Sequence, residues 1–365
     1  MAETARPDVR QIWQDTLGRA AIRSVQILVV IAVVYVITDV AIRLRLLVIP
    51  LLIATLIAAA AHPLVDWLSH KRVPRSLATI VTMLGGFAIL GGLGWWIGTA
   101  VAAQWDDLRQ SAVKGFGQLR SYLISGPLPI EQQDLAGMQE KVRGFLTGRQ
   151  VQESAISGAY AIVEFLTGLL LGIILLFFLL RDGRKIWAFV LELLPARHRA
   201  TWDKAATRSA WVLGRYVRGT AVVATVDAVV IGLGLLIVGV PLALPLAVAV
   251  FLGAFIPLVG ATAAGTLAAL VALVSEGPLI ALIVVGIVVA VNQLEGDLLY
   301  PVVMGQALSL HPLAILLALT AGTIVAGVVG AILSVPFAAV AWGVMQTFRE
   351  TRRDKGAPPA ETQQA

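Results

Sequence analysis

Long apolar runs alternate with short polar connections along most of this chain. Several of these runs approach or exceed the roughly 18 to 20 apolar residues that a helix needs to cross the hydrocarbon core of a bilayer. The pattern predicts an all-α, polytopic membrane protein with about six full spans. We expect these spans at residues 25–40, 46–68, 76–104, 157–180, 216–240 and 279–293.

Two further apolar segments, 241–274 and 312–347, are too long for a single span, and helix-breaking residues interrupt both. Each half would be too short to cross the core comfortably, since about 20 residues are needed. Both segments also open with Pro-Leu-Ala and continue with Leu-Ala three residues later. We interpret each as a re-entrant hairpin or a broken helix, which gives eight hydrophobic elements in all.

Polar and charged stretches divide the chain into six regions. These are an amphipathic lead-in (1–24), a three-span anchoring region (25–104), extracytoplasmic amphipathic helices (105–155), a fourth span with cytoplasmic basic helices (156–218), a transport domain with two broken hairpins (219–348) and a disordered tail (349–365). Residues 105–155 could form a packed cap or lie on the membrane surface.

Composition supports the membrane interpretation and argues against most enzyme classes. Of the 365 residues, 58% are hydrophobic and only 14% are charged, against about a quarter charged in soluble domains. The chain has no cysteine, and its four histidines are scattered, so we expect no metal site. Nucleotide-binding, hydrolase and zinc-protease motifs are absent from the sequence. We therefore expect no enzyme, no catalytic residues and no cofactor.

The positive charge follows the bias of membrane proteins rather than that of nucleic-acid-binding proteins. The net charge is +6, and most basic residues fall on one side if the N-terminus, residues 70–75, residues 181–218 and the tail are cytoplasmic. With five spans before the first broken segment, the two hairpins then enter from opposite faces. Inverted-repeat transporters build midplane sites in this way. We expect no nucleic-acid partner.

Acidic and amide side chains lie inside the apolar second half of the chain, where hydrocarbon cannot solvate them. Such residues often mark an ion or substrate path, and desolvated carboxylates there could exchange protons. The same groups could instead cap helices or hold neighbouring helices together. The candidates for the transport path are Asp227, Asn292, Gln293, Glu295 and Asp297.

Residues 219–348 contain no lysine or arginine, although the chain has 28 of them. An anionic cargo would normally meet a basic residue. A proton, a monovalent cation or a neutral polar molecule fits this composition better.

Helix-breaking residues in the same region form a second set of candidates. Breaking a helix frees backbone amides and carbonyls that can bind cargo or act in gating. Ordinary kinks in packed helices are the alternative. The residues are Pro257, Gly260, Pro301, Gly305, Pro312, Gly327 and Gly330.

Several motifs, in their order and spacing, resemble the autoinducer-2 exporter family of prokaryotic inner-membrane proteins. The resemblance covers the chain from about residue 45 onward. Its motifs are Val-Pro-Arg-Ser-Leu-Ala at 73–78, Arg-Asp-Gly at 181–183, Leu-Leu-Pro at 193–195, Arg-Tyr-Val-Arg-Gly at 215–219, Gly-Val-Pro at 239–241, Ile-Pro-Leu-Val-Gly at 256–260 and Gln-Leu-Glu through His-Pro at 293–312.

The resemblance implies a multi-pass permease of the inner membrane that forms a homo-oligomer, with a pentamer as one form. Activities attributed to such proteins include export of the neutral polyol autoinducer-2 and sodium (or lithium)/proton antiport. Three hypotheses follow: an exporter of a small neutral polar molecule, with or without proton coupling, a monovalent cation/proton antiporter, and a membrane scaffold that transports nothing. In each the lipid bilayer is a partner.

Overall fold

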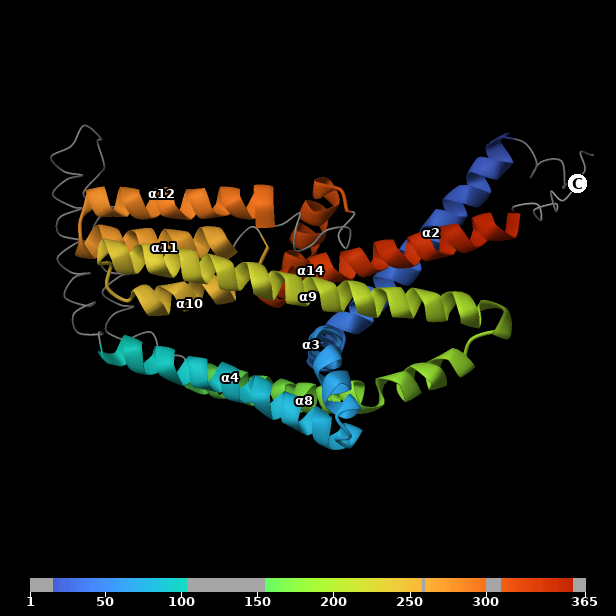
Figure 1. Cartoon of the computed structure of the whole chain (residues 1–365). Coiled ribbons are helices and arrows are strands. Elements are labelled where there is room, and N and C mark those ends of the chain that lie inside the picture. Colours follow the sequence, from blue (N-terminus) through green and yellow to red (C-terminus); the bar gives the residue numbers. More distant parts are fainter. Residues whose placement is uncertain (1–15, 104–154, 258–259, 300–309, 357–365) are drawn as a thin grey trace, which may run out of the picture. The chain divides into compact units, whose positions relative to one another are not determined.

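The computed structural model describes residues 16–103, 155–257, 260–299 and 310–356, and within these ranges the chain consists of helices joined by short connections, without strands (Figure 1). Outside them lie most of the predicted lead-in, nearly all of region 105–155, Pro301, Gly305 and the end of the tail. The helices are α2 (Thr16–Arg43), α3 (Arg45–His70), α4 (Arg75–Ala103), α8 (Ala155–Glu192), α9 (Ala196–Val238), α10 (Ala243–Gly253), α11 (Gly260–Ser275), α12 (Pro278–Leu294), the π-helical turn η1 (Glu295–Leu299) and α14 (Pro312–Gly356).

Seven of the described helices are long and apolar enough to cross a membrane, judged by length and composition. The prediction of an all-helical, polytopic membrane protein is therefore confirmed. The seven are α2, α3, α4, α8, α9, α12 and α14. The orientation of the termini and the division into six regions stay predictions.

The chain forms two compact units, residues 1–49 and 50–365. In the first, α2 carries apolar side chains that are largely exposed, such as Val25 and Leu28. A helix that is apolar all round and covered by no protein is typical of a lipid-facing span. The second unit contains the packed cores and every residue predicted to take part in transport.

Helices α8 and α9 are longer than a bilayer requires. Helix α9 has 43 residues and is about 65 Å long, twice the thickness of the hydrocarbon core. The two helices meet at a tight turn, where Arg199 donates hydrogen bonds to the carbonyls of Leu194 (3.0 Å) and Glu192 (2.9 Å). Farther along, Trp187 Nε1 donates to Asp203 Oδ1 (3.0 Å). The two bonds from Arg199 satisfy carbonyls at and just beyond the end of α8 that have no partner within the helix.

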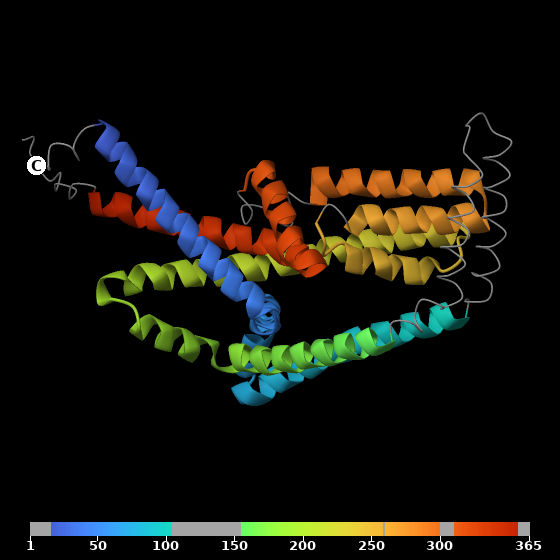
Figure 2. The same ribbon diagram turned by 180° about the vertical axis from the view of Figure 1, so that it is seen from behind.

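The C-terminal half of α9 packs with α10, α11 and α12 around the largest hydrophobic core of the second unit (Figures 1 and 2). Gly239, with a φ of 81°, ends α9 in a left-handed conformation that glycine adopts without strain. Pro278 then begins α12 at its first turn, where a missing N–H does no harm. The central buried residues are Ile231, Leu235, Leu246, Val250, Val284 and Val288.

The first long apolar segment is interrupted between α10 and α11, which have 11 and 16 residues and are both shorter than a span. Gly253 and Gly260 lie backbone to backbone at the interruption: a Cβ added to Gly253 would come within 2.9 Å of the Gly260 carbonyl oxygen. The two short helices contact each other along this turn. They form a helical hairpin in which positions 253 and 260 have no room for a side chain.

The second long segment is also interrupted, within α14. Ala326 (φ −140°, ψ 24°) and Gly327 (φ 57°, ψ −137°) leave the helical conformation. The chain turns back there, because a Cβ on either Gly322 or Gly330 would collide with the carbonyl oxygen of the other. Figure 1 shows the short first part of α14 at an angle to the long second part. That either segment re-enters the bilayer stays a prediction.

We predict that Gly330→Ala lowers the apparent melting temperature of the detergent-purified protein by several degrees. The added methyl group meets the Gly322 backbone, and overpacking of this kind costs about 1–3 kcal/mol. Gly286→Ala is the matched control, since a Cβ there meets nothing within 4 Å. Equal melting temperatures for the two variants would contradict the close glycine contact.

Candidate functional site

Asp227 belongs to the buried face of α9 rather than to a lipid-facing surface. Its side chain is only 3% exposed. Buried residues recur along the helix three or four positions apart, which places them on one side. In order they are Thr220, Val223, Ala224, Asp227, Ile231 and Leu235. The carboxylate is therefore directed into the protein, at the level of the apolar span.

The Asp227 carboxylate is incompletely satisfied. Its Oδ1 atom is buried and has no hydrogen-bond partner in the described part of the chain. Glu295 lies close enough for the two carboxylates to interact electrostatically, and α9 contacts the π-helical turn that begins at Glu295. A buried polar group without a partner is uncommon in folded proteins and needs a specific explanation.

Glu295 reaches this position because it continues the buried face of α12. The buried residues of that helix are Ala281, Val284, Val288 and Val291, and Glu295 follows one turn later, half-buried. The helix widens into the π-helical turn at this residue. Such turns are rare and occur frequently at functional sites.

The other three transport-path candidates differ in how far their side chains are buried. Asn292 is half-buried, whereas the side chains of Gln293 and Asp297 are exposed. The pair that the fold brings together is therefore Asp227 and Glu295, with Asn292 one turn from the latter.

Two neighbouring carboxylates without a counter-charge can bind a proton or a small cation. No lysine or arginine occurs in residues 219–348 to neutralise them. Two carboxylates near each other in an apolar medium are costly when both are ionised, so such an arrangement can accommodate a proton or a small cation. Among the described residues, no group of three or more His, Cys, Asp or Glu side chains could hold a metal ion.

Most of the helix-breaking candidates lie at the two interruptions. Pro257 is half-buried in the turn after α10, and Gly260 begins α11. Gly327 breaks α14, and Gly330 follows it. Pro312 starts α14, where the N–H of Leu313 donates to His311 Nδ1 (3.2 Å). Pro301 and Gly305 lie outside the described residues.

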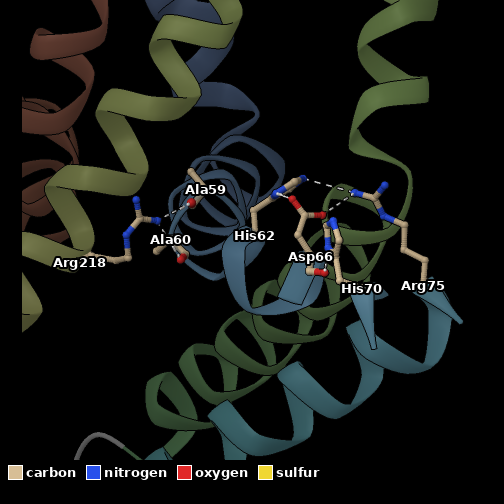
Figure 3. A network of polar contacts seen from close by, with 7 residues as sticks. All are labelled: Ala59, Ala60, His62, Asp66, His70, Arg75 and Arg218. Atoms are coloured by element: carbon tan, nitrogen blue, oxygen red, sulfur yellow. Dashed lines mark hydrogen bonds and ion pairs between the residues drawn. The ribbon is translucent and has the colours of Figure 1, made fainter. Parts of the chain in front are cut away.

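An arginine contact between α9 and α3 was not anticipated from the sequence (Figure 3). Pro63 lies inside α3 and has no N–H, so the Ala59 carbonyl loses its donor within the helix. Arg218 supplies a replacement, since Nη1 lies 3.3 Å from the Ala59 oxygen and 3.2 Å from the Ala60 oxygen. Gly214, one turn earlier, allows the close approach, because a Cβ there would lie 2.5 Å from the Ala59 oxygen. Pro63 predicts the free carbonyl, but only the fold identifies its donor.

A second polar network joins the end of α3 to the start of α4 (Figure 3). His62 Nδ1 lies 2.9 Å from Asp66 Oδ2. Arg75 Nη2 lies 3.3 Å from His62 Nε2 and 3.8 Å from Asp66 Oδ1. His70 Nδ1 donates to the Asp66 carbonyl (2.6 Å). These contacts hold the tight connection between the two helices.

We predict that Arg218→Gln destabilises the protein more in the natural chain than in a Pro63→Ala background. Alanine at 63 restores an N–H for the Ala59 carbonyl, so the arginine is no longer its sole donor. The loss in the natural chain should be about 1.5–3 kcal/mol, the contribution of a hydrogen bond that involves a charged group. Thermal unfolding of the four proteins of this double-mutant cycle measures it. Equal losses in both backgrounds would refute the compensation.

The comparisons with known proteins agree with this architecture. The protein-family model described as "AI-2E family transporter" matches residues 25–350. "Putative transport protein MT0215" of Mycobacterium tuberculosis is 42% identical over 299 residues, covering 80% of this chain and 81% of that protein. Two Bacillus subtilis proteins are more distant. "Putative transport protein YueF" is 26% identical over 93% of this chain and 98% of its own length. "Putative transport protein YrrI" is 27% identical over 84% of this chain and 88% of its own length. The chain belongs to the AI-2E transporter family.

Proposed function

We propose that the protein is a secondary transporter that exports a small neutral polar molecule, such as autoinducer-2, and that the Asp227–Glu295 pair binds the coupling proton. The observation that carries the proposal is the buried Asp227 side chain, whose Oδ1 lacks a hydrogen-bond partner among the described residues and which interacts with a second carboxylate. Membership of a transporter family supports the same conclusion.

The pair is suited to coupling because its charge can change. Protonation removes a negative charge from an apolar environment, which favours a closed, dry arrangement of the surrounding helices. Loss of the proton favours an arrangement that admits water. The helices around the pair include the broken hairpin α10–α11, which packs against α9 and α12. Alternation between two such arrangements is what a coupled transporter needs.

A monovalent cation/proton antiporter is the second candidate, and the same composition favours it. Residues 219–348 contain no basic residue to repel a cation. The free oxygen of Asp227, the Glu295 carboxylate and the Asn292 amide oxygen are ligands that sodium or lithium accepts. In that case the cation and the proton compete for one pair of carboxylates.

The setting of the transporter is also part of the proposal. It is an inner-membrane protein of a prokaryote with both termini in the cytoplasm, and it assembles as a homo-oligomer such as a pentamer. The charge bias of the connections supports the orientation. The hairpins at residues 253–260 and 322–330 then enter the bilayer from opposite faces, and their helix breaks act in gating. Enzymatic activity forms no part of the proposal.

Neutralising either carboxylate is expected to abolish coupled flux. Asp227→Asn and Glu295→Gln each remove the proton-binding charge, so transport driven by a pH gradient into proteoliposomes should fall about tenfold or more. Glu276→Gln is the matched control, an exposed acidic residue of the same region, and it should retain flux.

Unchanged flux in the Asp227→Asn and Glu295→Gln variants would refute the assignment of the site. Absence of flux in the wild-type protein for any cargo tested, with all four proteins folded, would instead support the scaffold hypothesis. Thermal unfolding in detergent distinguishes loss of transport from loss of the fold.

The cargo is tested separately by competition. If a polyol is carried, unlabelled autoinducer-2 should inhibit uptake of the labelled compound, and sodium should leave proton flux unchanged. If a cation is carried, addition of sodium or lithium to vesicles with an imposed pH gradient should release protons, and Asp227→Asn should abolish this response. Fluorescence of a trapped pH indicator measures the second outcome directly.

A further inference from the structure

Three pairs of a basic and an aromatic side chain flank the apolar parts of three helices. Lys71 lies over the ring of Trp67 (3.7 Å to the centroid), and the Arg181 guanidinium lies near the Phe177 ring (5.8 Å). On α9, Arg215 lies near Trp211 (5.5 Å). Cations attract aromatic faces, and aromatic and basic residues are both enriched where a span meets the lipid headgroups.

The position of Arg215 along α9 agrees with the headgroup level. Basic residues end at Arg218, and residues 219–238 are apolar apart from Asp227 and two threonines. This apolar part of the helix is about 30 Å long, the thickness of the hydrocarbon core. The Trp211 and Arg215 pair therefore lies where the phosphates of one leaflet are expected.

Arg215 differs from the arginines that precede and follow it on the same face of α9. Arg208 is bound to α14, with Nη2 donating to Gln346 Oε1 (2.7 Å) and Nη1 lying 3.3 Å from Glu350. Arg218 donates to α3. Arg215 is half-buried, and its buried Nε has no hydrogen-bond partner in the described part of the chain.

A half-buried guanidinium without a hydrogen-bond partner at its Nε is stabilised by an anionic acceptor. A buried, unpaired N–H of a charged group costs more than an ordinary lost hydrogen bond, and the described residues supply no carboxylate for Arg215. Phosphate oxygens match the planar donor set of arginine. The neighbouring Trp211 ring is 52% exposed, so it is free to contact the glycerol and acyl region of a lipid.

We propose that Arg215, with Trp211 beside it, forms a binding site for the phosphate headgroup of an anionic phospholipid, just before the apolar part of α9. The lipid phosphate accepts hydrogen bonds from the outer Nη groups of the arginine, and the upper acyl chain packs against the tryptophan. Because the arginine lies between the contacts of α9 with α3 and with α14, a bound lipid also covers the junction of these helices. Soluble phosphate lacks the apolar part that Trp211 would contact, which favours the lipid.

The test measures lipid retained by the purified full chain. Protein exchanged into detergent is titrated with phosphatidylglycerol or phosphatidylcholine, and native mass spectrometry counts the bound lipid. The wild-type protein should retain phosphatidylglycerol in preference, and Arg215→Gln should weaken this binding about fivefold or more. Lys204→Gln makes the same charge change at an exposed position of α9 and should bind as the wild type does.

Two further arms make the result decisive. Trp211→Leu, at an exposed position, keeps the charge and should weaken binding of phosphatidylglycerol while the protein stays folded, which covers the case that Arg215→Gln fails to fold. Inorganic phosphate at millimolar concentration should not displace the lipid. Equal retention of both lipids, unchanged binding in Arg215→Gln or Trp211→Leu, an equal loss in Lys204→Gln, or displacement by phosphate would overturn the proposal.

Discussion

The absence of water from the hydrocarbon core is the constraint on which this structure depends. A charged or unpaired polar group there costs several kcal/mol unless the protein receives it. The chain meets the constraint by directing Asp227 to the buried face of α9, where it is 3% exposed. Close to the apolar part of α9, Arg218 donates a hydrogen bond to the Ala59 carbonyl, because Pro63 has no N–H to donate to that carbonyl within the helix.

Interrupted helices make the same demand on the backbone, since each break frees amides and carbonyls. The two interruptions are built alike. In each, two glycines bring backbones together, Gly253 with Gly260 and Gly322 with Gly330, so the two arms of each hairpin pack closely beside the break.

Much of the fold could be predicted from the sequence, because hydrophobic length directly reports the membrane-spanning helices. Because a charge is costly in lipid, the sequence also identified Asp227 and Glu295 as candidates for the transport path. The same argument could not distinguish Glu295 from Asp297, since the two differ in the direction of their side chains around a π-helical turn. It also gave no role to Arg218, because its partner is a backbone carbonyl more than 150 residues away in the chain. Contacts that depend on tertiary packing leave little trace in one sequence.

The inward direction of the Asp227 side chain is tested most directly by thiol labelling. The natural chain has no cysteine, so only the introduced cysteine reacts. A single cysteine replaces Asp227, and a second protein carries one at Ile237, which is 85% exposed on the same helix. Both are treated in sealed vesicles with a small water-soluble thiol reagent and with a lipid-soluble one. Cysteine at 227 should resist the lipid-soluble reagent, because the side chain at this position is 3% exposed, whereas cysteine at 237 should react with it. Reaction of cysteine 227 with the lipid-soluble reagent alone would contradict the account.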